Sequence, residues 1–205
     1  MSIMIVDYGM GNLASVHRAF EEVGAAVFIS DRPADIEEAG SLVLPGVGSF
    51  SHGMESLKQS GFAEAIIKAT TEDRIPLLGI CLGMQLLADR GDEGGEQEGL
   101  GLIPGTIKKM EPSSEERLPH IGWNEVKLNA GAHSMFTGIA DSTDFYFVHS
   151  YHFDCPEKFA IAKTPYAGNI TSAVALEHIW GMQCHPEKSS KPGLKILENF
   201  LTAEH

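Results

Sequence analysis

A cysteine flanked by glycines is the residue most clearly suited to chemistry. Residues 79–83 read Gly-Ile-Cys-Leu-Gly and end a continuously apolar run that is typical of a strand buried on both faces. Glycines at these positions permit the sharp strand-to-helix turn that presents a nucleophile. We expect Cys81 to lie at the N-terminus of the next helix, whose dipole favours the thiolate, and the N–H of Leu82 to be an oxyanion donor. A small buried cysteine without a reaction is the alternative.

A thiol nucleophile needs a base, and the segment His185-Pro186-Glu187 offers one. Proline favours an extended chain here, so the imidazole and the carboxylate should project to the same side. Glu187 would then hold the imidazole by its far nitrogen, and Cys81, His185 and Glu187 form a candidate catalytic triad. The chain has nine histidines, and a structural role for His185 is the alternative.

A glycine-rich turn follows the apolar run at 42–44. Residues 45–50 read Pro-Gly-Val-Gly-Ser-Phe. In a parallel sheet this turn would lie at the same carboxyl-end edge as Cys81, where ligands bind. Its backbone N–H groups, those of Val47 or Gly48, are candidates to complete an oxyanion hole. An ordinary strand-to-helix turn is the alternative.

A second glycine pattern lies near the N-terminus. Residues 9–14 read Gly-Met-Gly-Asn-Leu-Ala, follow an apolar run and open a helical pattern, and Asp31 ends the next run. These features match the dinucleotide-binding fingerprint. Short glycine patterns match often by chance, so a tight turn without a cofactor is the interpretation that we favour.

The elements that position these residues change character along the chain. Up to about Arg90, short apolar runs alternate with helical patterns, which indicates a parallel sheet covered on both sides. Further on, short strands follow one another without long helices, which indicates an antiparallel extension. We therefore expect a single α/β domain over residues 1–205, with a mainly parallel open sheet flanked by helices. The expected strands are 3–6, 26–29, 42–44, 75–80, 106–110, 125–128, 145–148, 159–162 and 172–176, the expected helices are 13–23, 56–70, 82–90 and 194–201, and 91–99 is expected to be an acidic surface loop.

The composition limits the classes of function. Fifteen Lys and Arg against 28 Asp and Glu give a formal net charge of −13, so nucleic acid is a poor partner. The early apolar run is too short for a signal peptide or a membrane span. Three widely spaced cysteines do not suggest a disulfide framework, and we expect a cytoplasmic protein with free thiols. His149, His152 and Cys155 recur at three-residue steps without an evident fourth ligand, so we expect no metal site.

Together, these motifs resemble those of the class I, or triad, glutamine amidotransferases. The resemblance lies in the nucleophile segment, which continues through Met84 and Gln85, and in the His185-Pro186-Glu187 segment. Within that family the chain is similar to the glutaminase subunits of imidazole glycerol phosphate synthase, on segments 7–13, 45–50, 118–124, 148–151 and 185–189.

The resemblance implies the amidotransferase fold and hydrolysis of L-glutamine through a cysteine thioester, without a cofactor. It also implies a partner, a cyclase subunit with a (β/α)8 barrel, which combines the ammonia with a ribonucleotide in histidine biosynthesis. Carried over residue by residue, the glutamine-binding positions would be Gly46, Gln85, Glu93, Ser150 and Tyr151. The positions facing the partner would be Tyr8, Asn12, Trp123 and Lys188, which assigns the N-terminal glycine turn to a subunit interface.

Two alternatives use the same sequence features. A stand-alone cysteine hydrolase, such as a peptidase or a γ-glutamyl hydrolase on a related fold, would use the triad without a partner. A dinucleotide-binding protein would tolerate the loss of Cys81. One departure from the family is Cys184, where phenylalanine commonly precedes the catalytic histidine, and we expect this thiol to pack rather than react.

Overall fold

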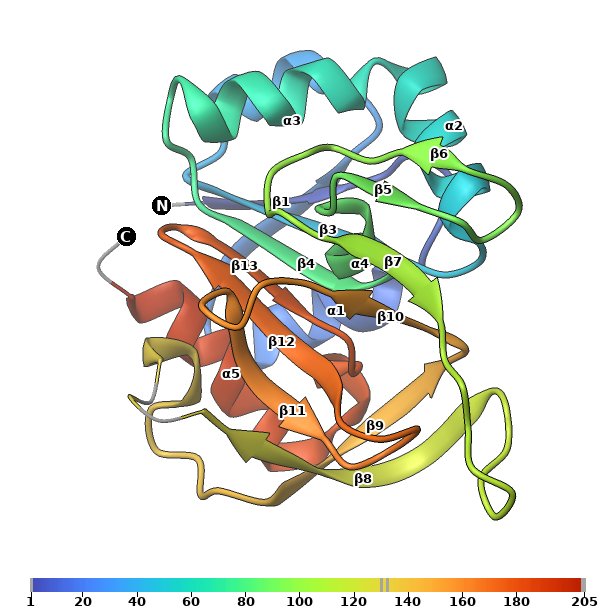
Figure 1. Cartoon of the computed structure of the whole chain (residues 1–205). Helices are drawn as coiled ribbons and strands as arrows, with labels where there is room; N and C mark the ends of the chain where they lie inside the picture. The colour runs from blue at the N-terminus through green and yellow to red at the C-terminus, as the bar shows by residue number, and fades with distance from the viewer. Residues whose placement is uncertain (1, 130, 132, 204–205) are drawn as a thin grey trace.

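A nine-stranded mixed sheet runs through the centre of the computed structural model, which describes residues 2–129, 131 and 133–203 (Figure 1). Five neighbouring strands are parallel, and four antiparallel strands extend the sheet beyond them, which confirms the expected fold class. In spatial order the strands are β2 (Ala26–Ser30), β1 (Ser2–Val6), β3 (Ser41–Gly46), β4 (Leu77–Cys81), β13 (Ile179–Met182), β12 (Ile170–Leu176), β11 (Ala160–Thr164), β8 (His120–Leu128) and β9 (Thr143–His149).

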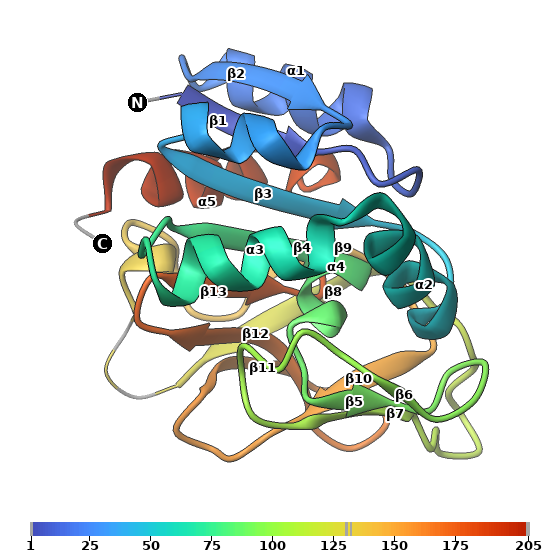
Figure 2. The ribbon, with the colours of Figure 1, turned by 90° about the horizontal axis from the view of Figure 1, so that it is seen from above.

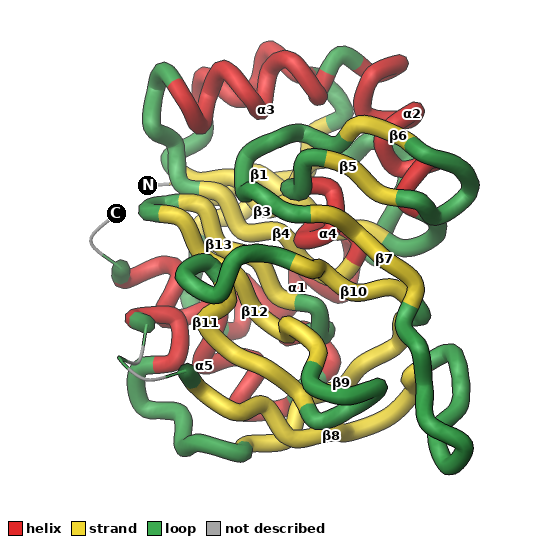
Figure 3. The backbone as a smooth tube through the Cα atoms, viewed as in Figure 1, coloured by secondary structure: helices red, strands yellow, loops and turns green. Residues whose placement is uncertain are grey.

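A smaller four-stranded sheet packs over β12 of the large one (Figure 3). Its edge strand β10 (Tyr151–Asp154) follows β9 in the chain after a single residue, so residues 149–151 lie at the corner between the two sheets. In spatial order its strands are β10 (Tyr151–Asp154), β7 (Thr106–Lys109), β5 (Arg90–Gly91) and β6 (Gln97–Glu98).

Helices cover both faces of the large sheet. Phe20 and Phe200 are buried in the core on one face, and Phe50 and Phe62 are buried in the core on the other. Seen from above, α3 lies in front of the strands and α5 behind them (Figure 2). No helix of the described residues is long and apolar enough to cross a membrane. The helices are α1 (Leu13–Glu22) and α5 (Ser190–Thr202) on the first face, α2 (Phe50–Ser60) and α3 (Phe62–Thr71) on the second, the short α4 (Leu82–Leu86), and the 3-10 turns η1 (Pro33–Glu38), η2 (Ser134–Phe136) and η3 (Pro186–Lys188).

Two of the expected helices differ in the structure. The helix expected at 56–70 is a pair, because Gly61 adopts φ 79°, the left-handed conformation that ends α2 before α3 begins. The helix expected at 82–90 is only the five residues of α4, because the chain turns at 87–89 and enters β5. The helix dipole behind Cys81 is therefore smaller than the sequence suggests, although the free N–H groups of the first turn remain.

Four strands are absent from the sequence prediction. β5 and β6 form a hairpin that begins at Arg90, one residue before the expected 91–99 loop, and takes up most of that loop. β10 follows β9 so closely that the apolar pattern does not separate them, and β13 forms a tight hairpin with β12. β13 matters most for function, because it pairs with β4 and leads directly to His185.

The turn around Cys81 is packed too closely for side chains on its flanking glycines. A Cβ atom on Gly83 would collide with the carbonyl oxygen of Leu44 on β3. A Cβ atom on Gly79 would lie 2.7 Å from the carbonyl oxygen of Gly83. Both obstacles are backbone atoms, so relieving them requires α4 to move away from the sheet.

Replacing Gly83 by alanine should lower the free energy of unfolding by about 3 kcal/mol, because the added methyl group meets backbone on β3. Urea denaturation measures this change. Gly53→Ala in α2 is the matched control, because its Cβ would meet only side-chain ends of Leu82 and Leu86, at 3.2 and 3.1 Å. That variant should stay within about 1 kcal/mol of the wild type. Equal stability of both variants would contradict the close contact of α4 with β3.

Candidate active site

The carboxyl ends of three adjacent parallel strands meet at one edge of the sheet. β4 ends at Cys81, β3 beside it ends at Gly46, and β13 on its other side leads to His185. Gly46 and Cys81 are opposite each other in the strand register. The glycine turn at 45–50 and the His-Pro-Glu segment thus reach Cys81 from its two sides.

The backbone of Cys81 has the strained geometry that its flanking glycines predict. Its φ of 55° and ψ of −110° are unusual for a residue with a side chain, and such conformations cost about 1–3 kcal/mol. The residue is only 6% exposed, but it lines a cavity. The strand-to-helix turn therefore presents the sulfur to this cavity.

His185 and Glu187 form a buried pair. Nδ1 of His185 donates to Oε1 of Glu187 over 2.8 Å, and the two side chains are 3% and 2% exposed. The structure thus brings the pair together as expected, but the segment is not extended. Residues 186–188 form the 3-10 turn η3, because proline is well suited to the first position of a helical turn.

The surroundings of His185 favour its protonated form. Burial alone would lower the pKa of His185, but the Cys81 sulfur and the Glu187 carboxylate outweigh it and raise this pKa above its usual value. Nε2 of His185 is buried and has no hydrogen-bond partner among the described residues. The ring therefore holds a proton at a nitrogen that protein atoms leave available.

A cavity of about 390 Å³ opens over Cys81. His185 also lines it, so both triad members that must touch a substrate are present. The lining includes these residues predicted to bind an oxyanion or glutamine: Val47, Gly48, Leu82, Gln85, Glu93, Ser150 and Tyr151. Gly46 is buried at the end of β3 and is not among the lining residues, so its part in binding glutamine stays a prediction. The sequence prediction missed the lining residues Pro119, Val148 and His149.

Two of these lining side chains are already bonded within the protein. Nε2 of Gln85 donates to the carbonyl oxygen of Tyr151 at 3.1 Å and to Oε1 of Gln183 at 3.0 Å. Oε2 of Glu93 accepts from the N–H of Phe50, at the start of α2, at 3.1 Å. Burial raises the pKa of Glu93, against the opposing effect of this hydrogen bond. Gln85 and Glu93 each keep one oxygen that these bonds do not use.

Comparison with known families identifies this arrangement. The family model for class-I glutamine amidotransferases matches residues 4–203. This chain belongs to that family. The site therefore belongs to an enzyme, a glutamine amidotransferase.

The amidotransferase has relatives that match it over nearly the whole chain. It is 46% identical over 199 residues to imidazole glycerol phosphate synthase subunit HisH 1 of Campylobacter jejuni strain RM1221, which covers 97% of this chain and 98% of the relative. It is 48% identical over 202 residues to the HisH subunit of Sulfurimonas denitrificans, covering 97% and 96%. A solved glutamine amidotransferase has a TM-score of 0.75 at 19% identity, covering 98% and 99% of the two chains. PurLQS of Thermotoga maritima has a TM-score of 0.74 at 18% identity, covering 98% and 97%. These two structures share the fold.

His149, which lines the amidotransferase cavity, forms a neutral pair with His120 behind it. Nδ1 of His149 donates to the carbonyl oxygen of Tyr151 at 2.8 Å. A carbonyl oxygen only accepts, so Nε2 of the neutral His149 ring accepts in turn, from Nδ1 of His120 at 3.1 Å. Burial lowers the pKa of His120 to about 4 and that of His149 to about 3. Both rings are uncharged at neutral pH.

Three of the four residues expected to face a partner are exposed. Trp123 on β8 is 53% exposed, and Lys188 is exposed at the end of η3. Both contact Tyr146, with a ring-to-ring distance of 6.2 Å and an Nζ-to-ring distance of 5.9 Å. Asn12 is exposed and caps α1 by accepting from the N–H of Ser15.

Tyr8 is the exception among these four, because its side chain is buried and not on the surface. Its hydroxyl donates to the carbonyl oxygen of Pro45 at 2.9 Å. Burial, together with the nearby Cys81, raises the pKa of Tyr8 and keeps it a phenol. The end of the Met10 side chain lies over Gly48. The N-terminal glycine turn is therefore packed against the 45–50 turn.

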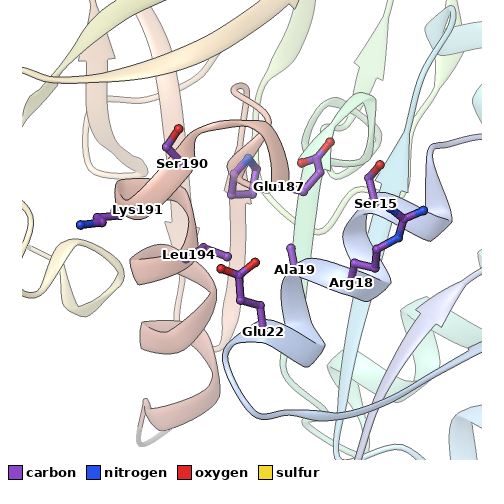
Figure 4. A pocket seen from close by; sticks show the side chains of 9 residues that line it. Ser15, Arg18, Ala19, Glu22, Glu187, Ser190, Lys191 and Leu194 are labelled. Carbon is purple, nitrogen blue, oxygen red and sulfur yellow. The ribbon is translucent and has the colours of Figure 1, made fainter.

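A second cavity, of about 410 Å³, lies behind the triad between α1 and α5 (Figure 4). Arg18 and Glu22 line it from α1, and Lys191 lines it from α5. Its lining reaches Glu187 but, in the described part of the chain, not Cys81. It is therefore not the place where the thiol meets a substrate.

Cys184 is fully buried in the core of the amidotransferase. Burial, with smaller contributions from Glu187 and Cys81, raises the pKa of Cys184 well above its usual value. Cys184 thus stays a packed thiol at neutral pH. Within the described ranges, no group of three or more His, Cys, Asp or Glu residues is arranged to hold a metal ion.

The neutral histidine pair predicts how stability depends on pH. His120 and His149 have folded-state pKa values below the unfolded value of about 6.5, so the unfolded chain binds more protons below that pH. The free energy of unfolding should fall between pH 6.5 and pH 4 by up to about 1.4 kcal/mol per pH unit for each histidine. His120→Phe should reduce that slope, measured by urea denaturation at pH 7, 6 and 5.

His52→Asn is the control for this measurement, because His52 is exposed on α2. It should leave the slope unchanged. A His120→Phe protein with the wild-type slope would show that His120 does not resist protonation in the folded state.

Proposed function

We propose that this amidotransferase is the glutaminase subunit of an imidazole glycerol phosphate synthase. The observation that carries the proposal is the cavity in which Cys81 and His185, held by Glu187, face side chains able to bind an amino acid. Full-length similarity to two relatives named as this subunit supports the choice of synthase. On this proposal the protein converts L-glutamine and water to glutamate and ammonia, and its own residues suffice for the chemistry.

The first half of the reaction forms a thioester. The Cys81 thiolate attacks the side-chain carbonyl carbon of glutamine, and a carbon–sulfur bond forms as the carbonyl oxygen takes up negative charge. When this intermediate collapses, the carbon–nitrogen bond breaks and Nε2 of His185 gives its proton to the departing nitrogen. Ammonia leaves, and a glutamyl thioester remains on Cys81.

Water completes the cycle. The now neutral His185 takes a proton from a water molecule, whose oxygen attacks the thioester carbon. The carbon–sulfur bond breaks, glutamate leaves, and the thiolate and imidazolium are restored. Glu187 keeps the ring oriented and stabilises its charge at both stages. We assign the oxyanion to the N–H of Leu82 and that of Val47 or Gly48, all of which line the cavity.

The cavity offers complementary groups for the amino-acid end of glutamine. The half-buried carboxylate of Glu93 suits the α-ammonium group, and Gln85 keeps a carbonyl oxygen as a further acceptor. Ser150 and Tyr151 lie at the corner between the two sheets and line the same cavity. We assign substrate binding to these four residues.

A partner must consume the ammonia, and we propose a cyclase subunit with a (β/α)8 barrel, acting in histidine biosynthesis. Ile121 and Trp123 are 60% and 53% exposed and lie two residues apart on β8, so they share a face. Exposed aromatic side chains of this kind serve as interface anchors. The proposal places the complex in the cytoplasm, where a free thiol such as Cys81 stays reduced.

Partner binding has two short routes to the reacting groups. The 8–12 turn contacts the oxyanion turn through Met10, which lies over Gly48. On the other side, the Tyr146 ring contacts Trp123 and Lys188, while its backbone carbonyl accepts from the N–H of His185 at 2.9 Å. We propose that the oxyanion donors reach their reactive arrangement only when the partner is bound and loaded.

The proposed function is tested by measuring glutamate formation with and without the cyclase subunit and its nucleotide ligand. Turnover should rise at least about 100-fold with the loaded partner, because one oxyanion donor is worth about 10²–10³ in rate. Cys81→Ala should abolish it. Full turnover without a partner would point instead to a stand-alone hydrolase, and no turnover under any condition would overturn the glutaminase assignment.

The proposed partner surface is tested by Trp123→Ala. The Kd for the cyclase subunit should rise about 30-fold, equivalent to about 2 kcal/mol, because an interface anchor is lost. Ile67→Ala on α3 is the control, because Ile67 is 37% exposed on the opposite side of the molecule from β8 (Figure 1). Calorimetric titration measures both. Equal affinities in the two variants would exclude this face of β8 from the interface.

A further inference from the structure

A buried glutamine lies directly beside the nucleophile and has no place in the triad. Nε2 of Gln183 is 3.8 Å from the sulfur of Cys81, within hydrogen-bond distance for a sulfur acceptor. Gln183 has no exposed surface. Burying an amide is costly unless it is hydrogen-bonded, and an apolar side chain would fill the same space without that cost. This polar side chain therefore calls for a chemical explanation.

The orientation of the Gln183 amide is fixed by its neighbours. The carbonyl oxygen of Tyr151 can only accept, so Gln85 must present its Nε2 hydrogens there. The same Nε2 lies 3.0 Å from Oε1 of Gln183, and its second hydrogen is donated to that oxygen. The Gln183 oxygen is thus occupied as an acceptor, and its N–H group must face Cys81.

The carbonyl oxygen of Tyr151 is also hydrogen-bonded to the histidine pair. His149 donates to it, and His120 donates to His149. Nε2 of His120 is then an acceptor, and Nδ2 of Asn124 lies 3.2 Å from it. Oδ1 of Asn124 accepts from the backbone N–H of Glu125 at 2.9 Å, which sets the direction of the amide independently. Every hydrogen bond in this series, from Asn124 on β8 to Gln183 beside Cys81, therefore joins a donor to an acceptor.

We propose that Gln183 is a further catalytic residue of the amidotransferase, which donates an N–H to the Cys81 sulfur and stabilises the thiolate. Gln85 and the pair His120 and His149 are positioning residues for it. A hydrogen bond to a charged atom inside a protein is stronger than one to a neutral atom, so this donor favours the thiolate over the thiol. This donor adds to the effect of His185, because Gln183 and His185 are separate residues of the segment between β13 and η3 and each interacts with the sulfur. The inference rests on the proposed role of Cys81 as nucleophile.

The test is the pH dependence of Cys81 alkylation by iodoacetamide, followed by peptide mass spectrometry so that Cys155 and Cys184 are counted separately. Gln183→Met keeps the approximate shape of the side chain and removes the donor. It should move the pH profile of Cys81 alkylation to higher pH and slow alkylation at pH 7 about five- to tenfold. An unchanged pH profile in a folded Gln183→Met protein would overturn the proposal.

Asn199→Leu is the matched control. Asn199 is also a buried amide, but it donates to the carbonyl oxygens of Met135 and Thr137, on η2 and just beyond it. Its loss should destabilise the fold and leave the Cys81 profile unchanged. A shift of equal size in both variants would show that general destabilisation, rather than the Gln183 donor, controls the thiol.

A measurement on the unmutated side chain covers the case in which Gln183→Met does not fold. In ¹⁵N NMR spectra, the side-chain NH₂ signals of Gln183 should move with pH at the same midpoint as Cys81 alkylation, and this movement should vanish in Cys81→Ala. Gln183 side-chain signals that do not follow the pH profile of Cys81 alkylation would overturn the proposal. Neither measurement uses glutamine or a partner, so both outcomes are independent of whether the protein proves to be a glutaminase.

Discussion

The strained backbone at Cys81 is the constraint on which the site depends. A φ of 55° turns the chain from β4 into α4 within one residue, and it aims the sulfur out of the sheet edge into the cavity. The turn fits only because α4 packs against the backbone of β3, where Gly83 meets Leu44 without a side chain between them. The strain is thus held by the close packing of α4 against the backbone of β3.

The order of the strands explains how distant segments come to surround one atom. β4 lies between β3 and β13, so the residues that follow each of its neighbours reach Cys81 from opposite sides. β3 leads into the glycine turn with its N–H groups, and the segment that follows β13 supplies Gln183 and His185. β13 is parallel to β4, whereas β12 is antiparallel to β13, so the parallel half of the sheet ends immediately beside the site. The corner of residues 149–151 closes the cavity from the antiparallel half.

The sequence predicts what depends on local pattern and misses what depends on packing. The glycines around Cys81 and the spacing of His185 and Glu187 are local signals, and the structure brings these residues together. Tyr8 carries no local sign of burial, because its environment is built by Pro45 on another strand. The role of Gln183 likewise depends on partners 98 and 102 residues away. Hydrogen bonds between residues so far apart in the sequence produce no periodic pattern from which they could be predicted.

Two buried histidines of the cavity show why only one of them is suited to acid–base chemistry. In both His185 and His149, Nδ1 donates over 2.8 Å, and both rings are almost fully buried. The acceptor is the Glu187 carboxylate for His185 and a neutral backbone carbonyl for His149. Burial therefore prevails at His149 and lowers its pKa to about 3, whereas the carboxylate and the Cys81 sulfur prevail at His185 and raise its pKa. The charged groups beside His185, the Cys81 sulfur and the Glu187 carboxylate, rather than distance or exposure, make His185 the proton donor. Without such neighbours His149 is a neutral support for the Tyr151 carbonyl.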